Sequence, residues 1–472
     1  GSTILHDIAR TPLFDKNILK MLLNSNCNPP INPNIVDNDG NSPLHIACFK
    51  ENSLFVTSLI DLSPFEIDVN IINKKYQTPL NVVCMKNAFV IFETLFSSKL
   101  CDNIDINLTS PIFIAAYKQH FVLVNKLLEM PRIDLNCNKN QPDYSDYESI
   151  EYDFYGCNLV HIISSYDSLD LLKYLLQTDN FDINEKTLEY IPNGINGTPL
   201  IIALKNNQKN NVNFFIENFG SQLDLSIFDS SGLAAIHYCL ELNNPTNSIE
   251  ILKELINIDE RIIDMEVDNK SRKTPLMIAF QNNSFDCCNL LLDNPSLNLF
   301  CIDINQNSIF HYLAKQKRKD IIDLTLRKLK ASPYDWDDAI ELINIDNNEG
   351  KTALLIGCEY SNYTFVNSLI ETFGDSLDFS KSDFNNNSPF IAAIKSRNNE
   401  SINLLILNEN CISNVDLSVP INENKDYILQ LIAKNSTLNN FILLIQQASN
   451  HLSNPEIDLI NVKNYKNKDK YV

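Results

Sequence analysis

Long apolar runs and a leader peptide are both absent from this sequence of 472 residues. No stretch of about 18 consecutive apolar residues occurs, which is the length that a membrane-spanning helix needs. The first residues, GSTILHDIAR, also lack the charged and then apolar order of a secretion signal. We therefore expect a cytoplasmic protein with no membrane insertion.

Basic residues and paired cysteines are scarce as well. The chain has 38 lysines and arginines against 59 aspartates and glutamates, which gives a formal charge of −21. A protein needs concentrated Lys and Arg to displace counterions from a phosphate backbone, so this charge excludes nucleic acid as a partner. The 12 cysteines form no CxxC pair, so we expect reduced thiols and neither a zinc site nor a disulfide framework.

Sequence motifs of catalysis are missing too. HExxH, P-loop, GxGxxG and GxSxG patterns do not occur, and the carboxylates are dispersed along the chain rather than paired on one face. No serine stands beside a histidine in a turn typical of a nucleophile. We therefore predict a non-enzymatic protein that uses no cofactor and no metal.

What the sequence does contain is one motif repeated along its length. GNSPLHIAC, at residues 40–48, recurs as YQTPLNVVC at 76–84, LTSPIFIAA at 108–116 and GCNLVHIIS at 156–164. Further copies bring the number to about twelve, at spacings of roughly 32 to 48 residues. Such a period is typical of a solenoid in which each repeat packs only on its neighbours.

Each copy has the features of two short helices. A Thr or Ser can cap the first helix, Pro fits its first turn, and apolar residues follow. The second helix is amphipathic, as in SLFVTSLI at 53–60, and a segment such as IDVN at 67–70 leads to the next copy. Pro64, Pro131 and Pro295 come just after second helices and are expected to stop them.

Glycine and asparagine show opposite biases. The chain has only 10 glycines, while asparagine makes up roughly one residue in seven. Asn tolerates left-handed backbone better than most residues, so we predict that it occupies turn positions, as in FNNNSP at 384–389. The asparagine excess itself is interpreted as the mark of an AT-rich genome rather than of chemistry.

The TPLH-like motif, the paired helices and the terminal D-[VI]-N together resemble the ankyrin-repeat family across essentially the whole chain. The resemblance implies an all-α fold, namely a curved solenoid of helix-turn-helix repeats with hairpin fingers and a concave surface that binds other proteins. We accordingly predict one continuous array over 1–472. Within it we expect an enlarged acidic, tyrosine-rich finger at 139–155, an insertion with a short helix at 330–344 and a polar, Lys-rich tail at 461–472.

Histidines and cysteines fall at positions of the repeat that suit structural roles. One set of histidines occupies the fourth position of the TPLH motif, where we expect structural hydrogen bonds. Its members are His6, His45, His161, His237 and His311. His120 falls where the family has the His of its Gly-His turn and receives the same interpretation. Four cysteines take a position that favours a small buried residue. They are Cys48, Cys84, Cys239 and Cys358.

The resemblance also implies that the two residues following the small pair of each first helix face the concavity. In the four copies quoted above, from 40–48 to 156–164, this position carries a large apolar or aromatic side chain, and in three of them a lysine follows it. We hypothesise that this surface binds a partner segment with acidic and apolar residues. The alternative is that the lysines only solvate an exposed helix face, and both interpretations stay open. The candidate protein-binding residues are Phe49, Lys50, Met85, Lys86, Tyr117, Lys118, Tyr144, Tyr147, Tyr152, Tyr166 and Lys205.

The tyrosine-rich insertion, PDYSDYESIEYDFYG at 142–156, has three possible roles. In the first, its acidic side chains dock on the lysines and close the groove. In the second, its tyrosines contact a partner, and in the third the segment is solvated and disordered. The sequence leaves all three open. For Trp336, in the second insertion, packing against the edge of the stack is favoured over binding a partner.

These features together predict a scaffold that binds a partner protein through its concave face and fingers. The alternative is a regulatory or substrate-recruiting ankyrin domain of a larger channel, kinase or ubiquitin ligase. Solenoid ends need polar caps, and neither terminus resembles a purpose-built one, so we expect a fragment of a longer protein. The identity of the partner and the oligomeric state are left open.

Overall fold

The computed structural model describes most of the chain. The described residues are 1–24, 31–131, 133–135, 156–178, 181–187, 196–241, 245–268, 271–331, 335–415, 417, 421 and 427–451. Their regular structure consists of helices and short 3-10 turns, with two isolated bridges in place of strands. The predicted all-α fold is thereby confirmed. The chain divides into two compact units, 1–230 and 231–472, and each is described by itself. The single continuous array over 1–472 stays a prediction.

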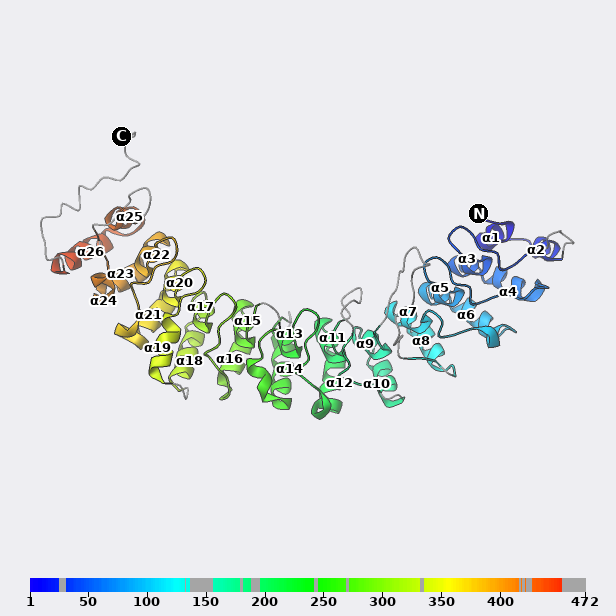
Figure 1. The fold of residues 1–472 in the computed structure, drawn as a ribbon, viewed down its shortest axis with the longest axis horizontal. Helices are drawn as coiled ribbons and strands as arrows, with labels where there is room; N and C mark the ends of the chain where they lie inside the picture. The colour runs from blue at the N-terminus through cyan, green and yellow to red at the C-terminus, as the bar shows by residue number, and fades with distance from the viewer. Residues whose placement is uncertain are drawn as a thin grey trace, which may run out of the picture. The chain divides into compact units, whose positions relative to one another are not determined.

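In the described part of 1–230, helices follow one another in pairs. They are α1 (Ile4–Arg10), α2 (Lys16–Leu23), α3 (Pro43–Phe49), α4 (Ser53–Leu62), α5 (Pro79–Lys86), α6 (Phe89–Phe96), α7 (Pro111–Tyr117), α8 (Phe121–Leu128), α9 (Leu159–Ser164), α10 (Leu169–Thr178), α11 (Pro199–Lys205) and α12 (Lys209–Phe219). The first helix of each pair, here called the inner helix, packs on the next inner helix, from α1 through α11. The second, or outer, helices follow one another along the other side of the unit (Figure 1).

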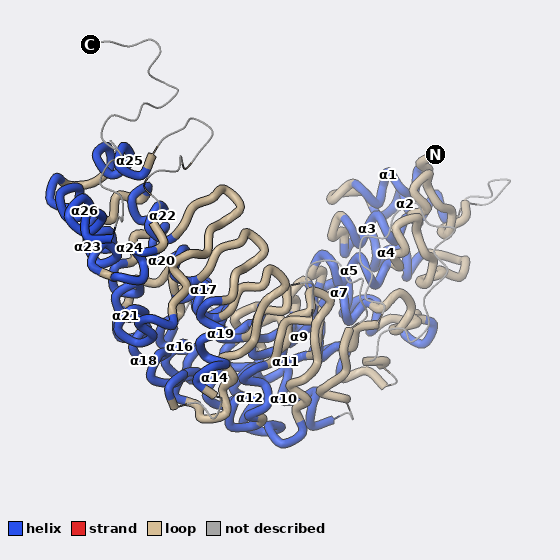
Figure 2. Tube along the Cα trace, turned by 60° about the vertical axis from the view of Figure 1, so that its left-hand side comes forward, coloured by secondary structure: helices blue, strands red, loops and turns tan. Residues whose placement is uncertain are grey.

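The unit 231–472 repeats the same arrangement. Its helices are α13 (Ala235–Glu241), α14 (Pro245–Ile258), α15 (Pro275–Gln281), α16 (Phe285–Asp293), α17 (Ile309–Leu313), α18 (Lys319–Lys330), α19 (Trp336–Asn344), α20 (Ala353–Glu359), α21 (Tyr363–Phe373), α22 (Pro389–Lys395), α23 (Asn399–Leu407), α24 (Glu409–Ser413), α25 (Ile428–Asn435) and α26 (Leu438–His451). Figure 2 shows the connecting loops projecting beside α17, α20 and α22.

Local sequence explains where the inner helices begin and why they are buried. Ser42 precedes α3, its Oγ accepts the backbone N–H of His45 at 3.4 Å, and Pro43 fills the first turn. In α5 the run from Pro79 to Cys84 is buried throughout. This helix is covered by α3, α7 and its own outer helix α6, so it is apolar on almost every side.

The motif histidines connect each repeat to the next one. In the second copy the Ser42 N–H donates to His45 Nδ1 at 3.1 Å, and His45 Nε2 donates to the Gln77 carbonyl at 3.0 Å. The same two bonds recur at the other members of the set, with Nε2 to carbonyl distances of 2.8 to 3.0 Å. Asn81 replaces the histidine in the third copy, where it accepts the Thr78 N–H and donates to the Thr109 carbonyl. The expected structural role of these histidines is confirmed.

Asparagines form a second set of bonds between repeats. Asn70, at the end of IDVN, accepts the Asp105 N–H at 2.9 Å and donates to the Asn103 carbonyl at 2.7 Å. Equivalent pairs of bonds are made by Asn34, Asn184 and Asn344. An amide side chain suits this position because it carries a donor and an acceptor side by side. These asparagines therefore have a structural role, and the interpretation of the excess as a genomic bias stays a prediction.

Turns and stops agree with the sequence pattern. Asn87, Asn207, Asn283 and Asn386 adopt left-handed backbone with φ of 56 to 57°, as predicted for turn asparagines. Gln119 does so as well, with φ of 61°, in a position where glycine would be free of strain. The outer helices α4, α8 and α16 end at Leu62, Leu128 and Asp293, before the three prolines that were expected to stop them.

The stretch 330–344 contains α19, which lies between α18 and α20 in sequence and packs on α20. Its first residue, Trp336, is 39% exposed, and its ring stacks on Phe373 with centroids 5.1 Å apart. Trp336 thus packs against α21 through one face, as favoured from the sequence. The finger residues 139–155 and the tail 461–472 lie outside the described residues.

Candidate functional site

The predicted binding residues of 1–230 lie where the inner helices end. Phe49 is the last residue of α3 and its side chain is 46% exposed. The Lys86 Nζ, from the end of the next inner helix, lies 4.2 Å from the centroid of the Phe49 ring. The Lys50 Nζ approaches the same ring from its own repeat, at 5.6 Å. An aromatic ring and two ammonium groups from neighbouring repeats therefore share one exposed site.

A second group forms around Tyr117, at the end of α7. The Lys118 Nζ lies 5.9 Å from the Tyr117 ring. Tyr166, from the following repeat, donates its hydroxyl proton to the Tyr117 carbonyl at 2.7 Å. Burial raises the pKa of Tyr166, and the neighbouring Tyr117 adds to this effect, so the hydroxyl stays protonated and available as a donor. Met85 lies between these two groups in the sequence, and its side chain is half-buried. Its sulfur accepts a contact from Gln77 Nε2 at 4.0 Å.

We name Phe49, Lys50, Met85, Lys86, Tyr117, Lys118 and Tyr166 the aromatic–lysine column. An ammonium over an exposed ring gains about 0.5–1 kcal/mol, which helps to hold the lysines against the rings. The column therefore presents apolar surface and positive charge together. Lys205, also predicted to belong here, donates instead from Nζ to Asn196 Oδ1 at 2.9 Å. Tyr144, Tyr147 and Tyr152 lie outside the described residues.

Comparison with protein families agrees with this architecture. A family model for ankyrin repeats in three copies matches residues 159–264 and 246–337, and a single-repeat ankyrin model matches residues 39–74. The chain contains ankyrin repeats. Ankyrin repeats form a protein–protein interaction domain, and the family is in general non-catalytic. A search of curated proteins gives no significant match to this sequence.

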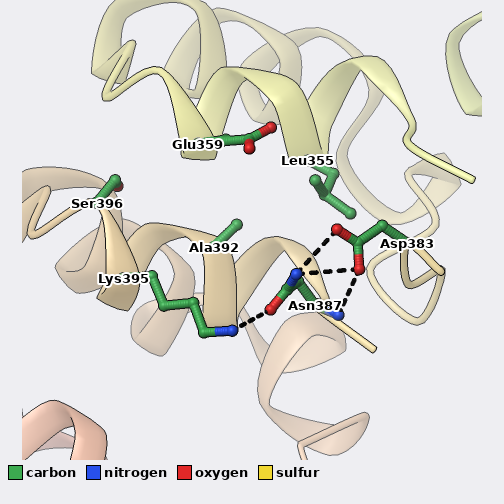
Figure 3. Close-up of a pocket in the computed structure, with 7 residues that line it drawn as sticks. All are labelled: Leu355, Glu359, Asp383, Asn387, Ala392, Lys395 and Ser396. Carbon is green, nitrogen blue, oxygen red and sulfur yellow. Dashed lines mark hydrogen bonds between the residues drawn. The ribbon is translucent and has the colours of Figure 1, made fainter. Parts of the chain in front are cut away.

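The corresponding surface of the second unit of this ankyrin-repeat protein is chemically different. Between α20 and α22, Glu359, Lys395 and Asp383 line a cavity of 220 Å³ (Figure 3). Lys395 Nζ donates to the side chain of Asn387, whose amide in turn donates to Asp383 at 2.9 and 3.1 Å. Lys395, Asn387 and Asp383 are thus joined by hydrogen bonds through the Asn387 amide.

A neighbouring cavity of 360 Å³ combines ion pairs with a lysine–ring contact. It is lined by Lys351, which forms ion pairs of 3.0 Å with both Glu349 and Glu359. Lys315 and Tyr360 also line this cavity, with the Lys315 Nζ 5.4 Å from the Tyr360 ring. This cavity thus contains one lysine that is paired with two carboxylates and a second lysine that lies against an aromatic ring, as Lys86 does in the first unit.

The buried cysteines and histidines of the ankyrin-repeat protein are suited to packing rather than to reaction. Burial raises the pKa of the Cys48 and Cys84 thiols far above the ordinary value, which keeps them protonated. Burial lowers the pKa of His45 and of His311 to about 4, so both rings are neutral near pH 7. Among the described residues, no group of three or more His, Cys, Asp or Glu is placed to hold a metal ion. Within the same residues, no helix combines the length and the hydropathy required to cross a bilayer.

The sequence analysis missed one exposed feature of the first unit. Leu54, Val90 and Val122, the second residues of the outer helices α4, α6 and α8, are 45%, 64% and 61% exposed. A pattern of apolar residues in an amphipathic helix predicts core positions, so these residues were not singled out. The exposure of these residues could have been predicted by comparing the copies, because most other copies carry polar residues at the same position.

Proposed function

We propose that this ankyrin-repeat protein is a non-enzymatic scaffold that binds a partner protein through the aromatic–lysine column of residues 1–230. The observation that supports it best is the exposed Phe49 ring with the Lys86 ammonium held 4.2 Å away. Aromatic and Met side chains are enriched at the centres of protein interfaces. The finger residues are expected to add contacts at the rim.

The chemistry of the column indicates a partner segment with both carboxylates and apolar side chains. Carboxylates would pair with Lys50, Lys86 and Lys118, and apolar groups would cover the Phe49 and Tyr117 rings. A protein is favoured over a nucleic acid because the whole chain has a formal charge of −21. The free, largely buried cysteines support a reducing compartment, so we place the protein in the cytoplasm.

The test is charge reversal of the column. Proteins are captured from an extract of the source cells with the full chain and with its Lys50→Glu/Lys86→Glu/Lys118→Glu variant. Each captured protein is quantified, then purified, and its affinity for both chains is measured. Three lost attractions become repulsions, so we expect at least a tenfold loss of affinity. The matched control reverses three exposed lysines on outer helices, Lys20, Lys253 and Lys319. Equal capture by a folded column variant contradicts the proposal.

A further inference from the structure

One position of the repeat distinguishes three consecutive copies from all others. It lies nine residues after the fourth residue of the TPLH motif and is the second residue of the outer helix. In most copies it is acidic or polar, namely Asp170, Asn210, Asp286, Asp320, Thr364 and Glu400. An acidic residue is expected there, since the first turn of a helix favours negative charge and disfavours β-branched apolar side chains. Only Leu54, Val90 and Val122 are apolar at this position.

The fold offers no cover for these three side chains. Val90 is 64% exposed and Val122 is 61% exposed, while Leu54 is 45% exposed. Asp170, Asp286 and Glu400 are also exposed at this position and Thr364 is half-buried, so the position faces solvent in most of the repeats described. The two valines therefore do not contribute to the core. Single exposed apolar residues are common and need no explanation, whereas a row of them in consecutive repeats does need one. We name Leu54, Val90 and Val122 the outer apolar row.

The outer apolar row has a regular spacing and a charged border. It follows the outer helices α4, α6 and α8, which succeed one another along the unit (Figure 1). Packed helices lie about 8–10 Å apart and α4 packs on α6, so we expect the row to present one aliphatic side chain about every 10 Å. Four residues before each member, across a tight turn, stands Lys50, Lys86 or Lys118. We therefore expect the lysines to lie beside the row, on the side of the turns.

We infer that the outer apolar row binds an amphipathic α-helix of a partner protein. A helix rises about 1.5 Å per residue, so residues seven apart are about 10.5 Å apart, which matches the spacing of the row. In an extended strand, residues three apart have a similar spacing but point to opposite faces, so a strand cannot place one side chain in each repeat. Carboxylates along one edge of the helix would complement the three lysines.

This helix would bind a different surface from the aromatic–lysine column. The two surfaces share the border lysines but use different apolar residues, on outer and inner helices. A partner could therefore place an acidic apolar segment on the column and a helix on the outer apolar row. The inference does not require that the proposed column interaction exist.

The test uses two displayed libraries of 22-residue peptides, selected on the full chain. The first library has leucines in a heptad pattern with glutamates along one edge, and the second has a proline at every third residue to keep the peptides extended. We expect binders from the heptad library. They should lose at least tenfold in affinity for the Leu54→Asp/Val90→Asp/Val122→Asp variant. This variant should fold normally, because other repeats carry aspartate at the same position.

A matched control and a second variant make the result decisive. The control, Ile304→Asp/Phe384→Asp/Leu438→Asp, places three aspartates at exposed apolar residues of the other unit and should bind the peptides as the wild type does. The inference is overturned if only the extended library gives binders, or if heptad binders tolerate the aspartates. Loss of those binders in Phe49→Ala/Tyr117→Ala alone assigns them to the column. Self-association of the wild type that the aspartates abolish identifies a second copy as the occupant and also overturns it.

Discussion

Acidification should weaken the 231–472 unit through His311. Its ring is neutral in the fold, where Nδ1 accepts the Ser308 N–H at 3.0 Å and Nε2 donates to the Lys351 carbonyl at 3.0 Å. Burial lowers its pKa to about 4, against an ordinary value of 6.5. Protonation would remove the acceptor at Nδ1 and leave a charge in an apolar site. The replacement His311→Asn removes the titration, and Asn81 shows that an asparagine can make both bonds at this position.

The size of the effect follows from the two pKa values. Above pH 6.5 the ring is neutral in both states, and the histidine adds no dependence on pH. Between pH 6.5 and about 4 only the unfolded chain takes up the proton, so the free energy of unfolding falls by about 1.4 kcal/mol per pH unit. From pH 7 to pH 5 the loss is about 2 kcal/mol, and below about pH 4 it should stop growing.

Trp336 provides the assay, because it is the only tryptophan of the chain and lies in the same unit. Urea unfolding is followed by its fluorescence at pH 7 and pH 5, for the wild type and for His311→Asn. Carboxylates titrate alike in both proteins, so the difference between the two pH dependences isolates the histidine. We expect the variant to lose about 2 kcal/mol less than the wild type over this range. An equal loss in both, or an NMR titration of His311 near pH 6.5, would refute the reasoning.

Two further predictions concern stability. Asn70→Ala removes two backbone-directed hydrogen bonds between repeats and should lower the free energy of unfolding by about 2 kcal/mol, measured by urea unfolding followed by circular dichroism. A loss below about 0.5 kcal/mol would show that water replaces these bonds. Gln119→Gly relieves left-handed strain at an exposed residue and should stabilise by about 0.5 kcal/mol, whereas Asn87→Gly, its control, should change little. Destabilisation by Gln119→Gly would mean that the greater freedom of the unfolded chain outweighs the strain.

Much of the fold could be predicted from the sequence because its causes are local. A cap at Ser42, a proline at position 43 and a stop at Pro64 each act within a few residues. The motif histidines were also assigned a structural role correctly, since their place in the motif repeats. The amide bonds of Asn70 were not predicted, because its partners Asn103 and Asp105 lie more than 30 residues away.

The candidate site shows the same limit. The sequence predicts that Phe49, Lys50 and Lys86 belong to one surface, but only from the resemblance to a family. That Lys86 reaches across to the Phe49 ring depends on the packing of α3 on α5. The exposure of Val90 and Val122 likewise depends on which face of each outer helix packs inward. The apolar character of a residue does not by itself show on which face of the helix it lies.

By itself, the sequence determined the repeat, the all-α class and the acidic charge of the chain, since these depend on short-range patterns and on composition. The tertiary structure alone decided which side chains of neighbouring repeats meet. In a solenoid these contacts join residues one repeat apart, so they depend on how helices stack. The Lys86–Phe49 contact, the asparagine bonds and the outer apolar row all arise at that level, and the proposed binding surfaces depend on them.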